Sequence, residues 1–161
     1  MSIISKDISI LIDNVLKKFP NDRKKSAIIE SLLILQHHNG GYVTREIMHD
    51  LSLYLSVNEI DIYEVATFYT MINTKPVGKN VISVCNNVSC MLRGSDKILS
   101  HIEKKLNIKV GESTDDNKIY LKDEIECLAA CNGAPMMQVN HKNYENISIK
   151  QVDEILSLIH I

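Results

Sequence analysis

Apolar residues in the first half of the chain recur at the three- and four-residue intervals of amphipathic helices. The first such pattern covers residues 8–19 and ends at Pro20. A second helix is predicted over about residues 22–38, because Gly40 and Gly41 follow it and glycine commonly ends helices. The chain therefore begins with at least one pair of helices.

Two further helices are predicted before the middle of the chain. Thr44 can accept a hydrogen bond from a free backbone N–H at the start of the third helix. Ser56 and Glu59 have the spacing of a capping box, which predicts the start of a fourth. Proline and glycine then interrupt the periodicity in residues 74–79. This interruption separates an N-terminal helical bundle, residues 1–77, from a second domain.

The second domain, residues 78–161, shows the mixture of short strands and helices that is typical of α/β folds. A β-branched run at residues 81–84 predicts a buried strand that delivers Cys85 at its end. A helical pattern opens at Cys90, where a thiolate would meet free backbone donors. The apolar face of this helix is predicted to consist of Leu92, Leu99, Ile102 and Leu106.

Further elements are predicted after this helix. Alternation over residues 119–125 indicates a half-buried strand that leads to Cys127. Residues 136–139 are predicted to be a strand, residues 140–143 a hairpin turn, and Ser148 with Gln151 the capping box of a last helix. The order strand, helix, strand, strand, helix is compatible with a thioredoxin-like α/β sandwich, and other small α/β folds would share it.

The composition bears on which classes of partner this chain can bind. With 161 residues, a formal charge of −2 and 5% aromatic residues, the chain has neither the basic surface nor the stacking platform of a nucleic-acid-binding protein. It contains no apolar stretch of the length that spans a membrane, so direct membrane insertion is not expected. The N-terminal residues lack the order of a signal peptide, and we expect a reducing compartment.

The cysteines are the main chemical signal. All four fall in two close pairs, Cys85-x4-Cys90 and Cys127-x3-Cys131, with 36 residues between the pairs. A reducing compartment disfavours disulfides, and a redox dithiol would need Cys-x-x-Cys. Structural zinc prefers tighter Cys-x2-Cys knuckles, and a zinc module stays the non-redox alternative. An iron–sulfur centre fits best, because a [2Fe–2S] cluster takes four thiolates, two on each iron.

Other candidate residues are weaker. His37 and His38 lie at the end of a predicted helix, where they favour a role as partners of the helix dipole over metal ligation. Glu126 beside Cys127 is either a solvated charge or a residue that tunes the cluster through its field. No glycine-rich phosphate loop and no pairing of nucleophile and base is found. The chain is therefore predicted to be an electron carrier without a substrate site of its own.

Several motifs together resemble one family. They are residues 63–69 (YEVATFY), residues 75–79 (KPVGK), residues 90–95 (CMLRGS) and the segment from Glu126 to Met136 with both cysteines of the second pair. The chain is similar here to the E subunit of respiratory NADH:quinone oxidoreductase, complex I. The resemblance covers the chain from about residue 22 to its end.

The resemblance implies a helical module joined to a thioredoxin-like ferredoxin domain with one [2Fe–2S] cluster. It implies that Cys85, Cys90, Cys127 and Cys131 are the ligands. In that family the E subunit pairs with the F subunit, which binds FMN and NADH, and the cluster takes one electron from reduced flavin. The resemblance thus implies an oxidoreductase and translocase subunit, within complex I, at the cytoplasmic face of a bacterial inner membrane.

The chain departs from the family pattern at two positions. Ala129 stands where glycine is common, so a positive φ there would strain the backbone by about 1 kcal/mol. Ser89 replaces a proline that is commoner before the second cysteine, a change we expect to be harmless. Related subunits serve NAD-linked hydrogenases and formate dehydrogenases, so the equivalent diaphorase subunit of such a complex is the alternative function.

Overall fold

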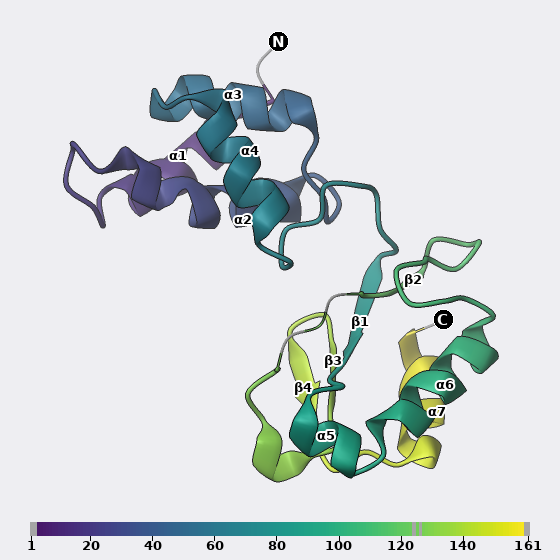
Figure 1. Cartoon of the computed structure of the whole chain (residues 1–161). Helices are drawn as coiled ribbons and strands as arrows, with labels where there is room; N and C mark the ends of the chain where they lie inside the picture. The colour runs from purple at the N-terminus through teal and green to yellow at the C-terminus, as the bar shows by residue number, and fades with distance from the viewer. Residues whose placement is uncertain (1–2, 124, 126, 160–161) are drawn as a thin grey trace. The chain divides into compact units, whose positions relative to one another are not determined.

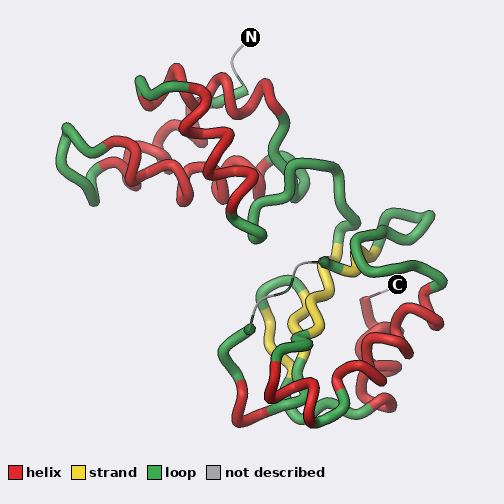
Figure 2. The backbone as a smooth tube through the Cα atoms, in the orientation of Figure 1, coloured by secondary structure: helices red, strands yellow, loops and turns green. Residues whose placement is uncertain are grey.

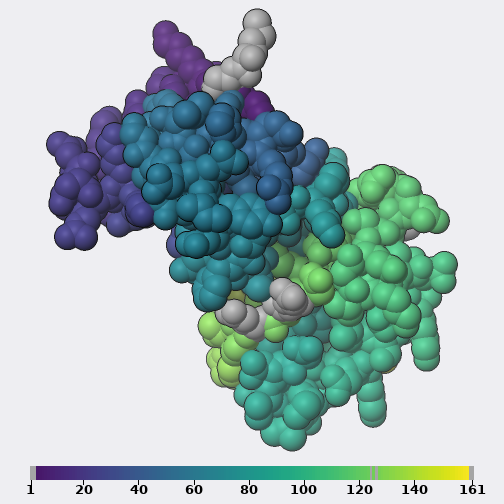
Figure 3. All heavy atoms as spheres, turned by 45° about the horizontal axis from the view of Figure 1, so that its top comes forward, coloured from purple at the N-terminus to yellow at the C-terminus, as the bar shows by residue number. Residues whose placement is uncertain are grey.

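Two units follow one another along the chain, Met1–Pro76 and Val77–Ile161. The computed structural model describes residues 3–123, 125 and 127–159. Helices make up the first unit, and a small sheet with helices makes up the second (Figure 2). Each unit has an apolar core of its own, and Figure 3 shows the heavy atoms of one face of the chain.

The first unit is a bundle of short helices around an apolar core (Figure 1). Its elements are α1 (Lys6–Leu16), a 3-10 turn (Lys24–Ala27), α2 (Ile28–His38), α3 (Arg45–Leu55) and α4 (Glu59–Phe68). Each α-helix contributes at least one fully buried apolar side chain, such as Ile12, Leu32, Leu51 and Ile62. Thr44 caps α3 as predicted, because its hydroxyl accepts a hydrogen bond from the Ile47 N–H.

The predicted boundaries in this unit needed three corrections. The first helix ends at Leu16, short of Phe19, and the second begins as a 3-10 turn before α2 starts at Ile28. The predicted capping box at Ser56 was wrong. Ser56 instead ends α3 in a left-handed conformation with φ of 56°, and the N-cap of α4 is Asn58, which makes no side-chain capping bond. Glu59, the other residue of the predicted capping box, pairs instead with His49.

The second unit is built on a four-stranded sheet with strand order β2-β1-β3-β4. The strands are β1 (Asn80–Val84), β2 (Ile119–Leu121), β3 (Met137–Val139) and β4 (Lys142–Tyr144). β1 pairs with β2 in parallel and with β3 antiparallel, and β3 pairs with β4 antiparallel. The helical crossover from β1 to β2 and the hairpin of β3 and β4 give a thioredoxin-like arrangement.

Two helices cover one face of this sheet. α6 (Ser95–Leu106) and α7 (Ile149–Ile159) lie side by side in Figure 1 and share a core with Ile82 and Leu121. Asp153 of α7 links them, because its Oδ1 accepts from His101 Nε2 and Lys105 Nζ of α6, each at 2.7 Å. The capping box predicted for α7 is confirmed: Ser148 and Gln151 exchange backbone-to-side-chain hydrogen bonds.

The structure also corrected the prediction of one helix after the first cysteine pair. Two helices are present, α5 (Val88–Leu92) and α6, separated by Gly94 with φ of 88°. Leu92 is 77% exposed and takes no part in the apolar face assigned to it. Cys90 lies inside the short helix α5 and does not open a long one.

Two strand boundaries also differ from prediction. β2 ends at Leu121 and does not extend to the second cysteine pair. The hairpin turn is shorter than predicted, because Lys142 and Asn143 already belong to β4, a strand that the periodicity had not indicated.

Candidate metal centre

The four cysteines come from two connections beyond the strands of the sheet. Cys85 directly follows β1, where its N–H still donates to Met136 O, and Cys90 lies in α5. Cys127 and Cys131 enclose a three-residue loop that leads into the 3-10 turn Cys131–Gly133. Cys85 and Cys90 are each 2% exposed and pack in one small cluster with Ala130, Ala134, Met136 and Leu128, so residues of both connections meet there.

The thiols form one continuous series of contacts. The Cys85 thiol hydrogen-bonds the thiols of Cys90 and Cys127. The Sγ atoms of Cys127 and Cys131 are 3.5 Å apart. These contacts run from one connection to the other in the order Cys90, Cys85, Cys127, Cys131.

Backbone N–H groups surround the sulfurs. Leu128 and Asn87 donate to Cys85, Met136 donates to Cys90, and Ala129 donates to Cys127. Hydrogen bonds of this kind stabilise negative charge on sulfur and help set the potential of iron–sulfur centres. The small residues of the loop thus leave room for amide donors.

These contacts shift the pKa values of the two buried thiols, Cys85 and Cys90, in opposite directions. Burial raises the pKa of the Cys85 thiol, but the N–H donors of Leu128 and Asn87, together with the neighbouring thiols of Cys90 and Cys127, lower it, so this pKa lies below its usual value. Burial and the nearby Cys85 hold the pKa of Cys90 above its usual value, against the Met136 N–H. Cys85 is therefore the thiol of the buried pair that ionises more readily.

The donor set fits a binuclear cluster. Four thiols with amide donors supply the soft, anionic ligands that ferric iron bridged by sulfide requires. Two separate pairs of thiols, one from each connection, can supply two ligands to each of two irons.

Ala129 adopts the left-handed conformation that the sequence suggested, with φ of 58°. An L-residue with a side chain is strained there by about 1 kcal/mol. Its N–H is nevertheless the one that donates to Cys127. The fold therefore holds alanine in a glycine-like conformation at the point where the loop hydrogen-bonds a thiol.

We expect Ala129→Gly to stabilise the protein by about 0.5 kcal/mol, because relief of the left-handed strain exceeds the added entropy of the unfolded chain. Chemical unfolding followed by circular dichroism measures the change. Ala130→Gly is the matched control, because Ala130 has φ of −115° and is buried, so this variant should be less stable than the native chain. Equal destabilisation by both substitutions would show that Ala129 is not strained.

The other sequence candidates lie elsewhere. His37 and His38 occupy the last turn of α2, and His38 Nδ1 contacts Ile34 O at 2.8 Å. Glu126 lies outside the described residues. Lys122, a half-buried lysine just past β2, was not singled out by the sequence patterns. Its position among the alternating residues 119–125 was the one sign in the sequence that it extends this strand.

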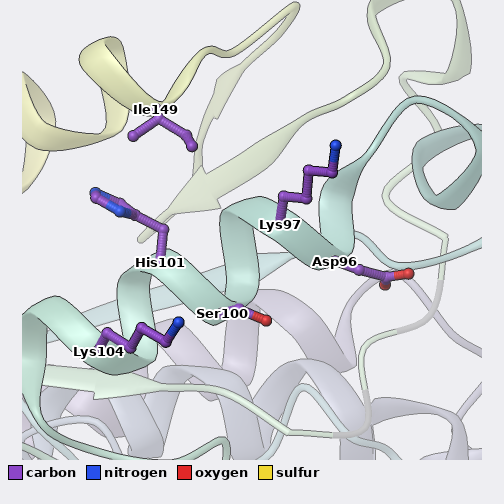
Figure 4. Close-up of a pocket in the computed structure, with 6 residues that line it drawn as sticks. All are labelled: Asp96, Lys97, Ser100, His101, Lys104 and Ile149. Carbon is purple, nitrogen blue, oxygen red and sulfur yellow. The ribbon is translucent and has the colours of Figure 1, made fainter.

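A shallow groove on the second unit is distinct from the cysteines. Figure 4 shows its side chains, which come from α6 and the start of α7. The lining residues are Asp96, Lys97, Ser100, His101, Lys104 and Ile149. No cysteine is among them, so this groove does not mark the candidate metal centre.

Comparison with known proteins agrees with this geometry. The family described as "Thioredoxin-like [2Fe-2S] ferredoxin" matches residues 12–160. The E subunit of NADH-quinone oxidoreductase from Rickettsia bellii is 43% identical over 146 residues, which are 91% of this chain and 87% of that protein. NADH dehydrogenase [ubiquinone] flavoprotein 2, mitochondrial, of Dictyostelium discoideum is 38% identical over 93% of this chain and 60% of that protein.

Fold, site and family match together define a class: the protein is a thioredoxin-like ferredoxin that carries one [2Fe–2S] cluster. The identity to curated relatives narrows this class further. The chain belongs to the family of NADH-quinone oxidoreductase E subunits, and it is accordingly an electron-transfer subunit of an oxidoreductase.

A solved structure of a different enzyme contains a similar fold. A chain of the NAD+-reducing [NiFe]-hydrogenase in the air-oxidised state matches with a TM-score of 0.68 and 19% identity. The match covers 80% of this chain and 22% of the hydrogenase chain. At this identity the similarity is evidence for the fold alone.

Proposed function

We propose that this chain is the electron-transfer subunit of an NADH:quinone oxidoreductase that also acts as a translocase. Its [2Fe–2S] cluster would be held by Cys85, Cys90, Cys127 and Cys131. The observation that carries this proposal is the continuous series of contacts among the four thiols, two of them buried. When bound, the cluster supplies a centre that takes up and releases one electron at a time.

The two pairs of thiols would have different tasks. Cys85 and Cys90 are buried, which keeps water away, and they accept hydrogen bonds from backbone N–H groups, which stabilise charge on the sulfurs. Cys127 and Cys131 are exposed. An exposed pair supports entry of the electron from that side, because electron transfer needs the donor to approach closely.

The proposed donor is reduced FMN on a flavin- and NADH-binding partner, the F subunit of complex I. Reduced flavin carries two electrons from NADH, and this chain would accept them one at a time. In the part of the chain described, no helix has the length and apolarity needed to cross a membrane. Peripheral attachment to the cytoplasmic face of the inner membrane, through the rest of complex I, is the proposed location.

The equivalent subunit of a hydrogenase or formate dehydrogenase is the competing function. The hydrogenase match has 19% identity, whereas the Rickettsia bellii relative has 43% identity over 91% of this chain. The sequence similarity therefore favours the quinone-linked complex.

We expect the anaerobically purified chain to be coloured and to give the EPR signal of one reduced [2Fe–2S] cluster per chain. Mixed with its flavoprotein partner, the cluster should be reduced by NADH, whereas NADH alone should leave it oxidised. A colourless protein with one zinc per chain would overturn the proposal. Purification from the native cells with hydrogenase subunits in place of quinone-reducing ones would select the competing function.

A further inference from the structure

Lys122 lies on the same face of the sheet as the first cysteine of the site. The pairing of β1 with β2 places Ile82 beside Leu121, both buried under α6 and α7. Lys122 continues this pairing, because its N–H donates to Ile82 O at 2.9 Å. Successive side chains of a strand point to opposite faces, so Lys122 projects from the face that does not pack on these helices.

Cys85 shares that face. Ser83 and Cys85 alternate with Ile82 and Val84 along β1, and the bond from Cys85 N–H to Met136 O keeps the strand extended past its last residue. Lys122 comes directly after Leu121, the partner of Ile82, so it lies beside Ser83 of β1. Cys85 comes two residues after Ser83. Neighbouring strands lie about 4.8 Å apart and a parallel strand rises about 3.3 Å per residue, so the Cα atoms of Lys122 and Cys85 are roughly 8 Å apart, within reach of a long side chain.

This lysine makes no hydrogen bond or ion pair with the described residues, although the adjacent Asp123 acts on its charge. Its side chain is half-buried, and burial lowers its pKa, while the adjacent Asp123 opposes the shift. Among the described residues its Nζ makes no ion pair and no hydrogen bond, and the Asp123 carboxylate accepts from the Tyr120 hydroxyl. Removing a cation from water without pairing it opposes folding.

A half-buried cation that lacks an ion pair among the described residues is stabilised if a negative charge is present in the working protein. The four thiolates and their irons carry net negative charge, and reduction adds one more. A fixed positive charge stabilises the reduced form more than the oxidised form, and partial burial weakens the screening by water.

We propose that Lys122 is a positioning residue that raises the reduction potential of the [2Fe–2S] cluster by holding its ammonium group on the Cys85 side of the sheet. This inference rests on the proposed ligation of the cluster. It concerns the energy of the acceptor and not the route of the electron.

The test is redox-titrated EPR of the intact chain and of Lys122→Met, which keeps the length of the side chain and removes the charge. We expect the ratio of reduced to oxidised cluster at a fixed potential to fall about tenfold, which is about 59 mV for a one-electron centre. Lys122→Arg should restore the native potential. Lys150→Met, which removes an exposed lysine of α7, is the matched control and should leave it unchanged.

A second readout separates this role from a structural one. Because burial of the cation opposes folding, Lys122→Met should leave the cluster-free chain as stable as the native chain or more stable, measured by chemical unfolding. An unchanged potential in Lys122→Met, with the cluster present, would overturn the inference and leave the proposed function standing. Absence of any iron–sulfur signal in the native chain would instead overturn the proposed function itself.

Discussion

Replacing Cys127 by alanine should abolish the EPR signal of the reduced cluster. The four thiols are the only cysteines of the chain, so no other thiol can replace the lost ligand. Cys127 also stands in the middle of the series, between Cys85 and Cys131. Its removal would therefore leave one iron of the proposed cluster with a single thiolate. EPR of the dithionite-reduced protein, with iron and sulfide analysis, measures the loss.

Cys127 is the preferred position because the fold does not depend on it. Its side chain is exposed, whereas Cys85 is 2% exposed and its replacement would also disturb packing. The cluster-free Cys127→Ala protein should therefore keep the circular dichroism spectrum of the native chain. Asn132→Ala, an exposed change directly after Cys131, is the control and should keep the signal. An unchanged signal in Cys127→Ala would exclude this residue as a ligand.

Local patterns predicted the parts of the molecule that are decided locally. The run of β-branched residues gave β1, and the pair Ser148 and Gln151 gave the start of α7, because each signal lies within a few consecutive residues. The spacing of the cysteines, with no other cysteine present, predicted a cluster site, and the assignment of all four as its ligands stays a prediction. That prediction required only that the intervening strand and helix return the chain to the same edge of the sheet.

Errors arose where tertiary contacts decide between equivalent local signals. Ser56 has capping chemistry, but the chain needs a left-handed residue there to end α3, and Asn58 takes the N-cap of α4. Apolar spacing could not separate α5 from α6, because Gly94 breaks the helix without breaking the sequence period. No residue of β4 is fully buried, so this strand shows no apolar alternation to detect.

The break in the helical pattern places Gly78 in a predicted linker, and the structure shows a different reason for this glycine. A Cβ atom at position 78 would lie 2.5 Å from Ile119 C, 2.7 Å from Ile119 O and 2.8 Å from Tyr120 N. All three are backbone atoms of β2. Gly78 is therefore required by the close approach of two backbones and not by chain flexibility.

Gly78→Ala should lower the free energy of unfolding of the second unit by about 3 kcal/mol. β2 cannot move aside easily, since Ile119 is fully buried, pairs with Asn80 of β1 and exchanges hydrogen bonds with Thr114. Gly78 is fixed as well, because its N–H donates to Ser113 Oγ at 3.0 Å. The chain has no tryptophan, so urea unfolding is best followed by circular dichroism.

Gly94→Ala supplies the control within the same unit. Gly94 has φ of 88° and no atom within 4 Å of a Cβ built there, so its replacement carries only the conformational cost of about 1 kcal/mol. Gly78→Ala should be clearly the more damaging change, because it adds a clash between rigid backbones to a position without a positive φ. Stability of Gly78→Ala within about 0.5 kcal/mol of the native chain, the ordinary scatter of surface substitutions, would mean that β2 yields at Ile119. Since β1 delivers Cys85 from this paired region, a displaced β2 should also reduce the iron content of the purified variant.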